Sequence, residues 1–588
     1  MPPKRWIVRE AKPDQETQLA KTLGLSLLAA RFLVHRGLED PNQARAFWQA
    51  SLEDLHNPFA MTDMEKAVER ILTALEHGEQ IVVYGDYDVD GIAGTALLCT
   101  FFSEIGFPAR FFLPHRIEDG YGLNSEALEL LRKEGARLVI TVDNGISALE
   151  PAETAHRLGL DLIITDHHEP PELLPRALAI LNPRRPQCEY PFKSLSGVGV
   201  AFKLLLALRN RLRQRGFDRA PLPNLKRHLD LVALGTVADV APLGGENHTL
   251  LRHGLQELSV TSKPGLQSLK GEAGLKGAVT AADIGFRLAP RLNAVGRLGA
   301  ASAAVNLLLS TRLEESAELA SLLEAENRRR QQVQEEIYRD VKAQLQQSGE
   351  QDNPAIVLAS QQWHPGIIGI VASKIAEEYL RPVALIALEN GQGRGSSRSI
   401  PGLDLYECLR LCAAELKQFG GHTGAAGFTV QAGNLERFKS RFQEVAASLT
   451  SGIEIPAPLE VDGEATLSDL HTQAISDLEN LSPFGAGHPA PVFLWRGLRC
   501  ASKARRVGRE GEHVKFLVSD GRKVMDAIAF GCPQEAAEVL RSSPLLDLAA
   551  TPQANLWQGS LSVQLKVHDV RPAQSPEGPP SILSALES

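Results

Sequence analysis

Two clusters of ionisable residues, each placed after a short apolar run, constrain the fold of this chain more than any other feature. The first, Asp86–Asp90, contains three carboxylates and follows the β-branched run Gln80–Tyr84. The second, Asp166–His168, follows the similar run Leu160–Ile164. An apolar run of this length that ends in polar residues is typical of a buried strand in a parallel sheet. Because ligands of such sheets bind beyond the carboxyl ends of the strands, we expect both clusters to face one site.

Repulsion among the carboxylates points to bound cations. Three carboxylates within five residues disfavour one another's charge unless positive ions neutralise them. Divalent metals with oxygen ligands do this, and the neighbouring imidazoles favour an Mn²⁺-like ion over Ca²⁺. We expect Asp88 and Asp90 to approach different ions, and Asp143, which ends another apolar run, to bridge them. Asp239 is a further acidic position behind an apolar run, and Asp86 either binds metal or only orients the turn.

The same residues also have an ordinary structural interpretation. Taken singly, an Asp after a strand is more often a turn or helix cap. The acidic and Asp-His-His clusters at equivalent strand ends together make capping alone an insufficient explanation. Successive residues of a strand point in opposite directions, so we assign His167 to a metal ion and His168 to the substrate phosphate.

Composition restricts the class of protein. The chain of 588 residues is 43% apolar and has a net charge of −9, so contacts with nucleic acid must come from local basic surfaces. No apolar run approaches the ~20 residues needed to span a bilayer, and the N-terminus lacks the apolar segment of a secretory signal. The six cysteines form no CxxC pair, which favours buried reduced thiols over a zinc site or disulfides. We expect a cytoplasmic protein of roughly three or four domains.

The pattern of apolar residues predicts an α/β multidomain protein. Strand and helix patterns alternate up to about residue 240, which indicates a parallel sheet. A long polar helix follows, as is typical of a bridge between two domains. Helices are predicted at Leu403–Phe419 and Leu435–Leu449 in a second α/β unit, and short strands with Gly-rich turns then indicate a small barrel. The expected segments are an N-terminal helical region at 1–75, a parallel-sheet domain at 76–312, a connecting helix at 313–350, a smaller α/β domain at 351–453, an OB-type β-barrel at 454–572 and a disordered tail at 573–588.

The clusters, in their order along the chain, resemble the motifs of the DHH phosphoesterase superfamily. The matching segments are Asp86–Gly91, Val142–Gly145, Asp166–His168 and Gly235–Asp239. Phe419–Phe428 is similar to the GGHxxAAG motif of the associated DHHA1 domain. Within the superfamily the chain most resembles the RecJ family of bacterial single-strand-specific 5′→3′ exonucleases. Further segments that carry this resemblance are His56–Phe59, Pro290–Arg297, Trp363–Ser373, Ser396–Ser399 and Pro483–Pro489.

The resemblance implies two-metal hydrolysis of phosphodiesters. It places two ions, Mn²⁺ by preference or Mg²⁺, on Asp88, Asp90, Asp143, His167 and Asp239. Smaller members of the superfamily often have His at the position of Tyr84, and its absence here would make one ion depend on Asp86. The residues expected to act in the reaction itself are Asp143, His167 and His168.

The resemblance also implies a single-stranded DNA substrate that lies in a cleft between the two α/β domains. We expect a 5′-phosphate pocket formed by Ser396, Arg398, Ser399, Gly420, Gly421, His422 and Arg116, because glycine backbones and arginines match phosphate. Further phosphate- or DNA-binding candidates are Arg291, Asn293, Arg297 and His364. Arg505 and Lys515 belong to a basic stretch of the barrel, where OB folds bind single strands.

Two other functions compete with this interpretation. A DHH–DHHA1 hydrolase of short oligoribonucleotides or cyclic dinucleotides would need only the two central domains. A non-catalytic DNA-binding scaffold would typically have lost metal-site residues, and here all of them are present. The RecJ resemblance further implies a monomer that acts in DNA recombination and repair, with a single-strand-binding protein and a RecQ-like helicase as possible partners and without a membrane.

Overall fold

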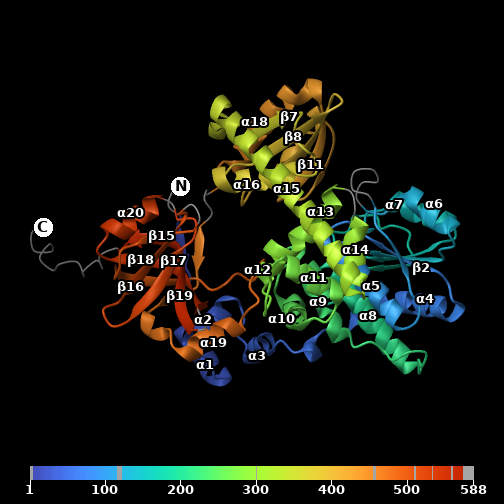
Figure 1. Cartoon of the computed structure of the whole chain (residues 1–588), viewed down its shortest axis with the longest axis horizontal. Helices are drawn as coiled ribbons and strands as arrows, with labels where there is room; N and C mark the ends of the chain where they lie inside the picture. Colours follow the sequence, from blue (N-terminus) through green and yellow to red (C-terminus); the bar gives the residue numbers. More distant parts are fainter. Residues whose placement is uncertain are drawn as a thin grey trace, which may run out of the picture. The chain divides into compact units, whose positions relative to one another are not determined.

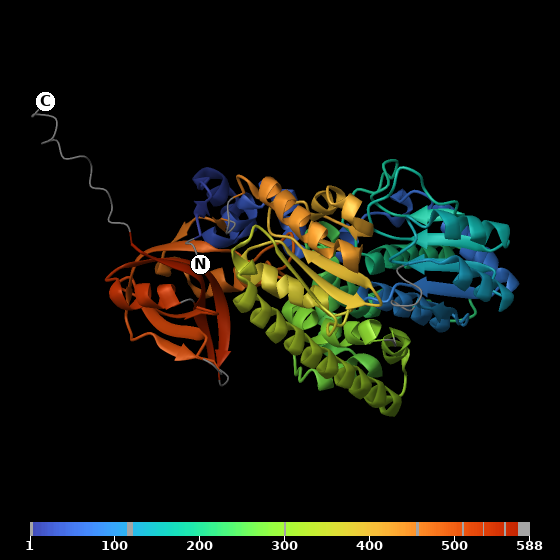
Figure 2. The same cartoon turned by 90° about the horizontal axis from the view of Figure 1, so that it is seen from above.

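The computed structural model describes residues 4–114, 122–298, 301–453, 458–508, 511–532, 534–557 and 560–573. The chain divides into two compact units. The larger unit contains Ser51–Ile455 together with Gly485–His488, and the smaller unit contains Met1–Ala50, Pro456–Phe484 and Pro489–Ser588. Figures 1 and 2 show the elements of both units, coloured along the sequence.

A parallel sheet forms the first part of the larger unit. Its strand order is β3-β2-β4-β5-β6, and every neighbouring pair is parallel. The strands are β2 (Ile81–Gly85), β3 (Arg110–Phe112), β4 (Leu138–Val142), β5 (Asp161–Thr165) and β6 (Ala179–Leu181). Because β3 and β4 lie on opposite sides of β2, the order reverses there, and such a reversal is where open α/β sheets bind ligands.

Helices cover both faces of this sheet (Figure 1). One face packs on α4 (Met64–His77), α5 (Val89–Glu104) and α8 (Gly197–Gln214) through alternate strand residues such as Val83 and Ile140. The other face packs on α6 (Ser125–Lys133) and α7 (Leu149–Arg157). The strands are apolar on both faces because both are buried. Further helices of this part are α9 (Leu229–Ala238), α10 (Gly245–Val260), α11 (Pro264–Glu272), α12 (Ala281–Asp283), the π-helix η4 (Ile284–Leu288), α13 (Ala289–Leu298) and α14 (Ala301–Leu309).

The long polar helix is α15, which spans Leu313–Ser348. Ala320 and Leu323 near its start pack into the core around the parallel sheet. Val341 and Leu345 near its end pack into the core of the second α/β domain. The predicted bridge between two domains is therefore confirmed as part of the fold.

The second α/β domain contains a mixed sheet in the order β10-β11-β9-β8-β7. Its elements are β7 (Ile356–Ser360), α16 (Ile368–Tyr379), β8 (Val383–Glu389), β9 (Gln392–Arg398), α17 (Leu405–Arg410), β10 (Leu416–Gly421), β11 (Ala425–Gln431) and α18 (Leu435–Thr450). The prediction of one helix over Leu403–Phe419 was wrong, since the helix ends at Arg410 and β10 begins at Leu416. Antiparallel pairing of β10 with β11 overrides the helical pattern there.

The smaller unit is an OB-type barrel joined by the start of the chain. The hydrogen-bonded order is β13-β14-β18-β19-β17-β16-β15, and an additional pairing of β14 with β16 closes the ring. The elements from the C-terminal part are β12 (Leu459–Val461), β13 (Glu464–Ala465), α19 (Thr472–Asn480), β14 (Phe493–Cys500), β15 (Arg505–Val507), β16 (His513–Ser519), β17 (Val524–Ala529), α20 (Gln534–Ser542), β18 (Leu546–Trp557) and β19 (Ser560–Pro572). The predicted fold class, with its α/β domains and OB-type barrel, is confirmed.

The N-terminal residues divide between the two units. The elements β1 (Trp6–Val8), α1 (Pro13–Leu23), α2 (Leu27–His35) and α3 (Pro41–Gln49) belong to the smaller unit. There β1 pairs in parallel with β12, and Phe32 and Leu33 share a core with barrel residues such as Phe493. Helix α4 belongs instead to the larger unit. The interval 1–75, expected as one helical region, is thus two separate pieces.

The remaining expectations concern membrane-spanning helices, the C-terminal tail and Arg116. Among the described residues, no helix is both long enough and apolar enough to cross a bilayer. The predicted disordered tail lies almost entirely outside the described residues, as does Arg116.

Candidate active site

The acidic and histidine clusters converge at the carboxyl edge of the parallel sheet. Asp86 and Asp88 follow β2, Asp143 follows β4 and His167 follows β5. Three overlapping groups have ligand atoms within 4.8 Å of one another: Asp143, His167 and His168; Asp90, His167 and Asp239; and Asp86, Asp88 and Asp143. All six residues expected to bind metal therefore lie in one cluster with His168.

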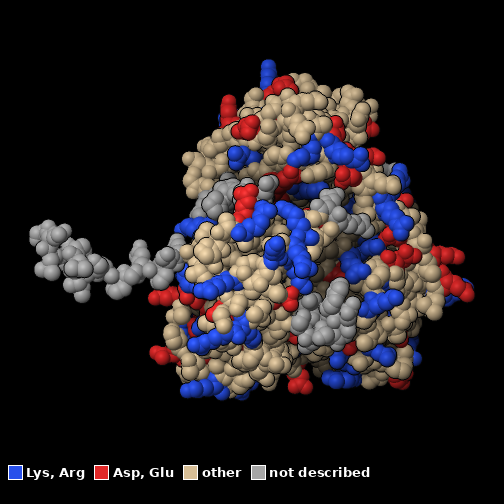
Figure 3. All heavy atoms as spheres, turned by 60° about the vertical axis from the view of Figure 1, so that its left-hand side comes forward, with Lys and Arg blue, Asp and Glu red and all other residues tan. Residues whose placement is uncertain are grey.

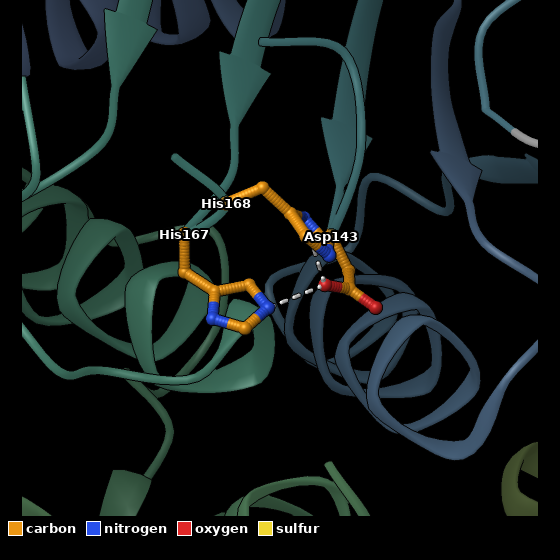
Figure 4. A group of neighbouring side chains, drawn as sticks. All are labelled: Asp143, His167 and His168. Atoms are coloured by element: carbon orange, nitrogen blue, oxygen red, sulfur yellow. Dashed lines mark ion pairs between the residues drawn. The ribbon is translucent and has the colours of Figure 1, made fainter. Parts of the chain in front are cut away.

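His167 lies at the centre of this cluster. Its Nε2 atom is 3.0 Å from Asp143 Oδ1, 3.8 Å from Asp239 Oδ2 and 3.9 Å from Asp90 Oδ2. The contact with Asp143 lacks hydrogen-bond geometry, so the buried nitrogen faces oxygens without donating to them. Figure 4 shows His167 and His168 both facing Asp143. This is the arrangement expected of atoms that share a cation.

The first acidic loop is fixed by the helices that begin beside it. Asp88 caps α5 by accepting hydrogen bonds from the N–H groups of Asp90 and Gly91. The carboxylate of Asp90 accepts from Gly197 N–H at 2.6 Å and Val198 N–H at 3.0 Å, at the start of α8. The capping interpretation thus holds for both residues, but capping leaves lone pairs on their oxygens that face the cluster.

Two further carboxylates, those of Asp143 and Asp239, reach the cluster from a tightly packed turn and from a helix end. Asp143 has a φ of +65°, in the left-handed region that Asp tolerates better than most residues. A Cβ atom at Gly197 would lie 2.6 Å from the Cβ of Asp143, so only glycine lets α8 approach this closely. Asp239 comes from a helix rather than a strand, because it is the residue that ends α9.

The electrostatics of the cluster favour a bound cation. Burial, followed by repulsion from Asp239, raises the pKa of Asp90 to about 7. Burial and the charge of Asp88 likewise raise the pKa of Asp239 to about 7, and burial with four neighbouring carboxylates raises that of Asp143 well above its ordinary value. Burial lowers the pKa of His167, which favours the neutral imidazole that metals bind. Oxygen and imidazole ligands around an excess of negative charge fit Mn²⁺ or Mg²⁺.

Asp166 holds the second cluster in place, and its role was not predicted. One oxygen accepts hydrogen bonds from the N–H groups of His167 and His168 and lies 2.7 Å from His168 Nδ1. The other accepts from Ile146 N–H. Burial alone would lower the pKa of His168, but the hydrogen bond to Asp166 and the nearby carboxylates raise it to about 9. The Asp of the Asp-His-His motif was the only available signal for this role.

Tyr84 does not take part in the cluster. Its side chain lies in the core on the opposite face of the sheet, and its hydroxyl donates to Gly122 O. The suggestion that Asp86 contributes instead agrees with the position of Asp86 beside Asp88 and Asp143.

The second domain places Arg398 and Ser396 against the start of α16. Arg398 Nε donates to Ser373 Oγ at 2.9 Å, and Nη1 donates to Ser396 Oγ at 3.0 Å. A Cβ atom at Gly369, in the first turn of α16, would lie 2.7 Å from Arg398 Nη2. An arginine and a hydroxyl beside each other suit an anionic group.

The other candidates of this domain lie in turns or at a strand end beside one. The hydroxyl of Ser399 donates to Leu403 O, so it supports the turn that follows β9. Gly420, Gly421 and His422 are exposed at the end of the hairpin between β10 and β11. His364 lies half-buried before α16, where its Nδ1 accepts from Gly366 N–H.

Several expected DNA-binding residues have other partners. Arg291, on α13, is largely buried and pairs with Glu324 of α15 at 2.8 Å, so it fastens these two helices. Asn293 is half-buried on the same helix, and the side chain of Arg297 lies outside the described part. Arg505 and Lys515 are exposed and face each other across β15 and β16, with Lys515 also 3.3 Å from Asp526. Figure 3 shows Lys and Arg interspersed with Asp and Glu on one face, so positive charge is local.

Comparison with known proteins identifies the relatives of this chain. Family models match as the DHH family N-terminal domain over residues 80–236, the DHHA1 domain over 352–448 and the RecJ OB domain over 461–569. The single-stranded-DNA-specific exonuclease RecJ of Bacillus subtilis (strain 168) is 36% identical over 568 residues, which cover 96% of this chain and 70% of the relative. The chain belongs to the RecJ family.

Solved structures of the RecJ family extend this similarity to the fold. RecJ from Thermus thermophilus in complex with Mn²⁺ matches with a TM-score of 0.81 and 32% identity, over 98% of this chain and 80% of that one. The same protein in complex with Mg²⁺ matches with a TM-score of 0.76 and 31% identity, over 98% and 79%. The predicted resemblance to the RecJ family is therefore confirmed.

Proposed function

We propose that this chain is a single-strand-specific DNA exonuclease that degrades DNA from the 5′ end to mononucleotides by two-metal hydrolysis. The observation that carries the proposal is the convergence of Asp90, Asp143, His167 and Asp239 at the point where the sheet order reverses. RecJ relatives named as single-stranded-DNA-specific exonucleases support the substrate class, and the RecJ complexes with Mn²⁺ and Mg²⁺ support the metals.

The residues of the cluster have distinct roles in this proposal. Asp86, Asp88, Asp90, Asp143, His167 and Asp239 would hold two divalent ions, and Asp143 belongs to two of the three groups of neighbouring ligand atoms. The ions supply the activation of a water nucleophile and the neutralisation of charge on the phosphate. His168 keeps a proton on the imidazole beside Asp166 and offers positive charge to the phosphate in the transition state. Asp166 orients both histidines through the backbone and the ring of His168.

The main test follows the fate of single-stranded DNA labelled at either end, in Mn²⁺, with duplex DNA and a dinucleotide as parallel substrates. We expect early release of a labelled 5′-mononucleotide from the single strand and little from the duplex. Cleavage confined to the dinucleotide would favour the short-substrate hydrolase, and DNA binding without cleavage would favour the scaffold. Release from the 3′ end would overturn the polarity.

The 5′-phosphate pocket gives a separate prediction. Arg398→Ala removes a charged donor from the start of α16, so we expect KM to rise about 10-fold for 5′-phosphorylated DNA and little for 5′-hydroxyl DNA. The measurement is steady-state kinetics on the two substrates. Arg437→Ala, at an exposed arginine of α18 in the same domain, is the matched control. An equal rise in KM for 5′-phosphorylated and 5′-hydroxyl DNA would show that Arg398 does not bind the 5′-phosphate.

The wider role of the protein belongs to the same proposal. We place it in DNA recombination and repair in the cytoplasm, as a monomer that works with a single-strand-binding protein and a RecQ-like helicase. A cleft between the two α/β domains would admit one strand, and the exposed Arg505 and Lys515 of the barrel would add affinity that falls steeply with salt.

A further inference from the structure

A four-residue turn, Gly485–His488, packs beside the segment that follows the metal-binding candidate Asp239. The turn belongs to the larger unit, although the residues before and after it belong to the smaller one. Its ends hydrogen-bond to each other, with 2.9 Å from Gly485 N to His488 O and 3.2 Å from His488 N to Gly485 O. Leu243, four residues after Asp239, donates its backbone N–H to Ala486 O at 2.7 Å.

The packing between the turn and this segment is close at both glycines. A Cβ atom at Gly485 would lie 2.6 Å from Leu243 Cδ1. A Cβ atom at Gly487, where φ is +66°, would lie 2.9 Å from Pro242 Cβ and 3.2 Å from Pro242 Cα. His488 is buried and its ring centroid lies 5.5 Å from that of His248 on α10. The turn is therefore a tightly packed part of the larger unit and not a loose connection.

The residue immediately after Asp239 has a strained backbone. Val240 has a φ of +58°, and the N–H groups of Val240 and Ala241 donate to Val237 O and Thr236 O. This geometry ends helices with a left-handed residue, a position that glycine usually occupies and that a β-branched residue disfavours. Such strain persists only where the surrounding structure imposes it.

The strain at Val240 is imposed from the segment that follows it. The side chain of Val240 is 69% exposed, so its own packing contributes little. Asn247, fully buried at the start of α10, donates from Nδ2 to Pro242 O at 3.0 Å and to Ser194 O at 2.6 Å. The turn provides the hydrogen bond to Leu243 and the surface against Pro242. Both sets of contacts fix Pro242 and Leu243 and so fix the direction in which α9 ends.

We propose that the Gly485–His488 turn is a positioning element of the metal centre. By holding Pro242 and Leu243 it keeps Val240 left-handed, and this keeps the carboxylate of Asp239 3.8 Å from His167 Nε2. The inference rests on the proposed metal binding of this cluster but not on the proposed action on DNA.

The test is Mn²⁺ binding to the full-length Gly487→Ala protein, measured from the electron paramagnetic resonance signal of free Mn²⁺. We expect affinity at the weaker class of sites to fall about 10-fold, as for other residues that support metal ligands indirectly. Gly497→Ala is the matched control, because Gly497 also has a positive φ, +63°, but its Cβ position has no described atom within 4 Å. Equal affinity of Gly487→Ala and wild type would overturn the proposal.

A rescue experiment separates positioning from general destabilisation. Val240→Gly relieves the left-handed strain, so the Gly487→Ala substitution should weaken Mn²⁺ binding less in a Val240→Gly protein than in the wild type. An equal loss in both backgrounds would show that the turn does not act through Val240. Gly485→Ala, whose Cβ meets only the end of the Leu243 side chain, provides a milder variant if Gly487→Ala fails to fold. We expect it to lower affinity in the same direction, and unchanged affinity would count against the proposal.

Failure of this inference and failure of the proposed function give different results. If the chain binds Mn²⁺ but does not degrade single-stranded DNA, the affinities still decide the role of the turn. If wild-type protein binds no Mn²⁺, both the metal centre and the positioning role are refuted.

Discussion

Replacing Asp143 with alanine is expected to abolish the release of 5′-mononucleotides from single-stranded DNA. Asp143 is shared by two of the three groups of ligand atoms, so its loss weakens both metal positions. Metal ions contribute several kcal/mol to stabilising a phosphoryl transition state, and we therefore expect kcat to fall at least about 1,000-fold. The measurement is single-turnover cleavage of end-labelled DNA, together with Mn²⁺ binding.

Asp143→Asn is a control for the left-handed backbone conformation of residue 143. Asp143 has a φ of +65°, and Asn tolerates the left-handed region better than Ala does. Both variants should lose activity to a similar degree, because both lack the carboxylate charge. Asp218→Asn, at an exposed carboxylate, should leave the rate unchanged. Substantial cleavage by Asp143→Asn would show that Asp143 is not a shared metal ligand.

Asp166→Asn is expected to lower kcat by about 100- to 1,000-fold, because it removes the partner that keeps His168 protonated. With the hydrogen bond to Asp166 and the nearby carboxylates in place, the pKa of His168 is about 9. The imidazolium is then present below that pH and is lost as pH rises through it. Without the Asp166 charge the pKa falls toward its ordinary value of about 6.5, so the proton is lost at lower pH.

The pH dependence of kcat distinguishes this role from a structural one. The falling limb of the profile should move to lower pH in Asp166→Asn, and the variant should recover part of its activity toward pH 6. A uniform loss at every pH, accompanied by a lower Tm, would instead indicate that Asp166 only stabilises the loop. His168→Ala should show a comparable loss without the pH-dependent recovery.

The sequence predicted the strands and the convergence of the acidic and histidine residues because both depend on local pattern. The β-branched runs before Asp86, Asp143 and Asp166 correspond to β2, β4 and β5, and parallel strands necessarily bring their carboxyl ends to one edge. Asp239 could be found only through its motif, since it ends a helix. The contact of Asp90 with Gly197 spans 107 residues and depends on how α8 packs, which no local pattern encodes.

Other features required tertiary structure. Leu416–Phe419 was included in a predicted helix, but its strand conformation follows from pairing with β11. Arg291 resembles a DNA-binding residue in the sequence, yet its guanidinium pairs with Glu324. The separation of the first 50 residues from α4 follows from the parallel pairing of β1 with β12, between segments about 450 residues apart.

The composition of the smaller unit from both ends of the chain affects its biosynthesis. Helices α1 and α2 leave the ribosome before the barrel residues that cover Phe32 and Leu33, which follow only after roughly 400 further residues. At a synthesis rate of about 5–20 residues per second, the apolar surfaces of these helices stay exposed for roughly 20–80 s before the barrel residues are made. During that interval the nascent chain presents a binding site for chaperones, and the parallel-sheet domain has time to fold before the barrel exists.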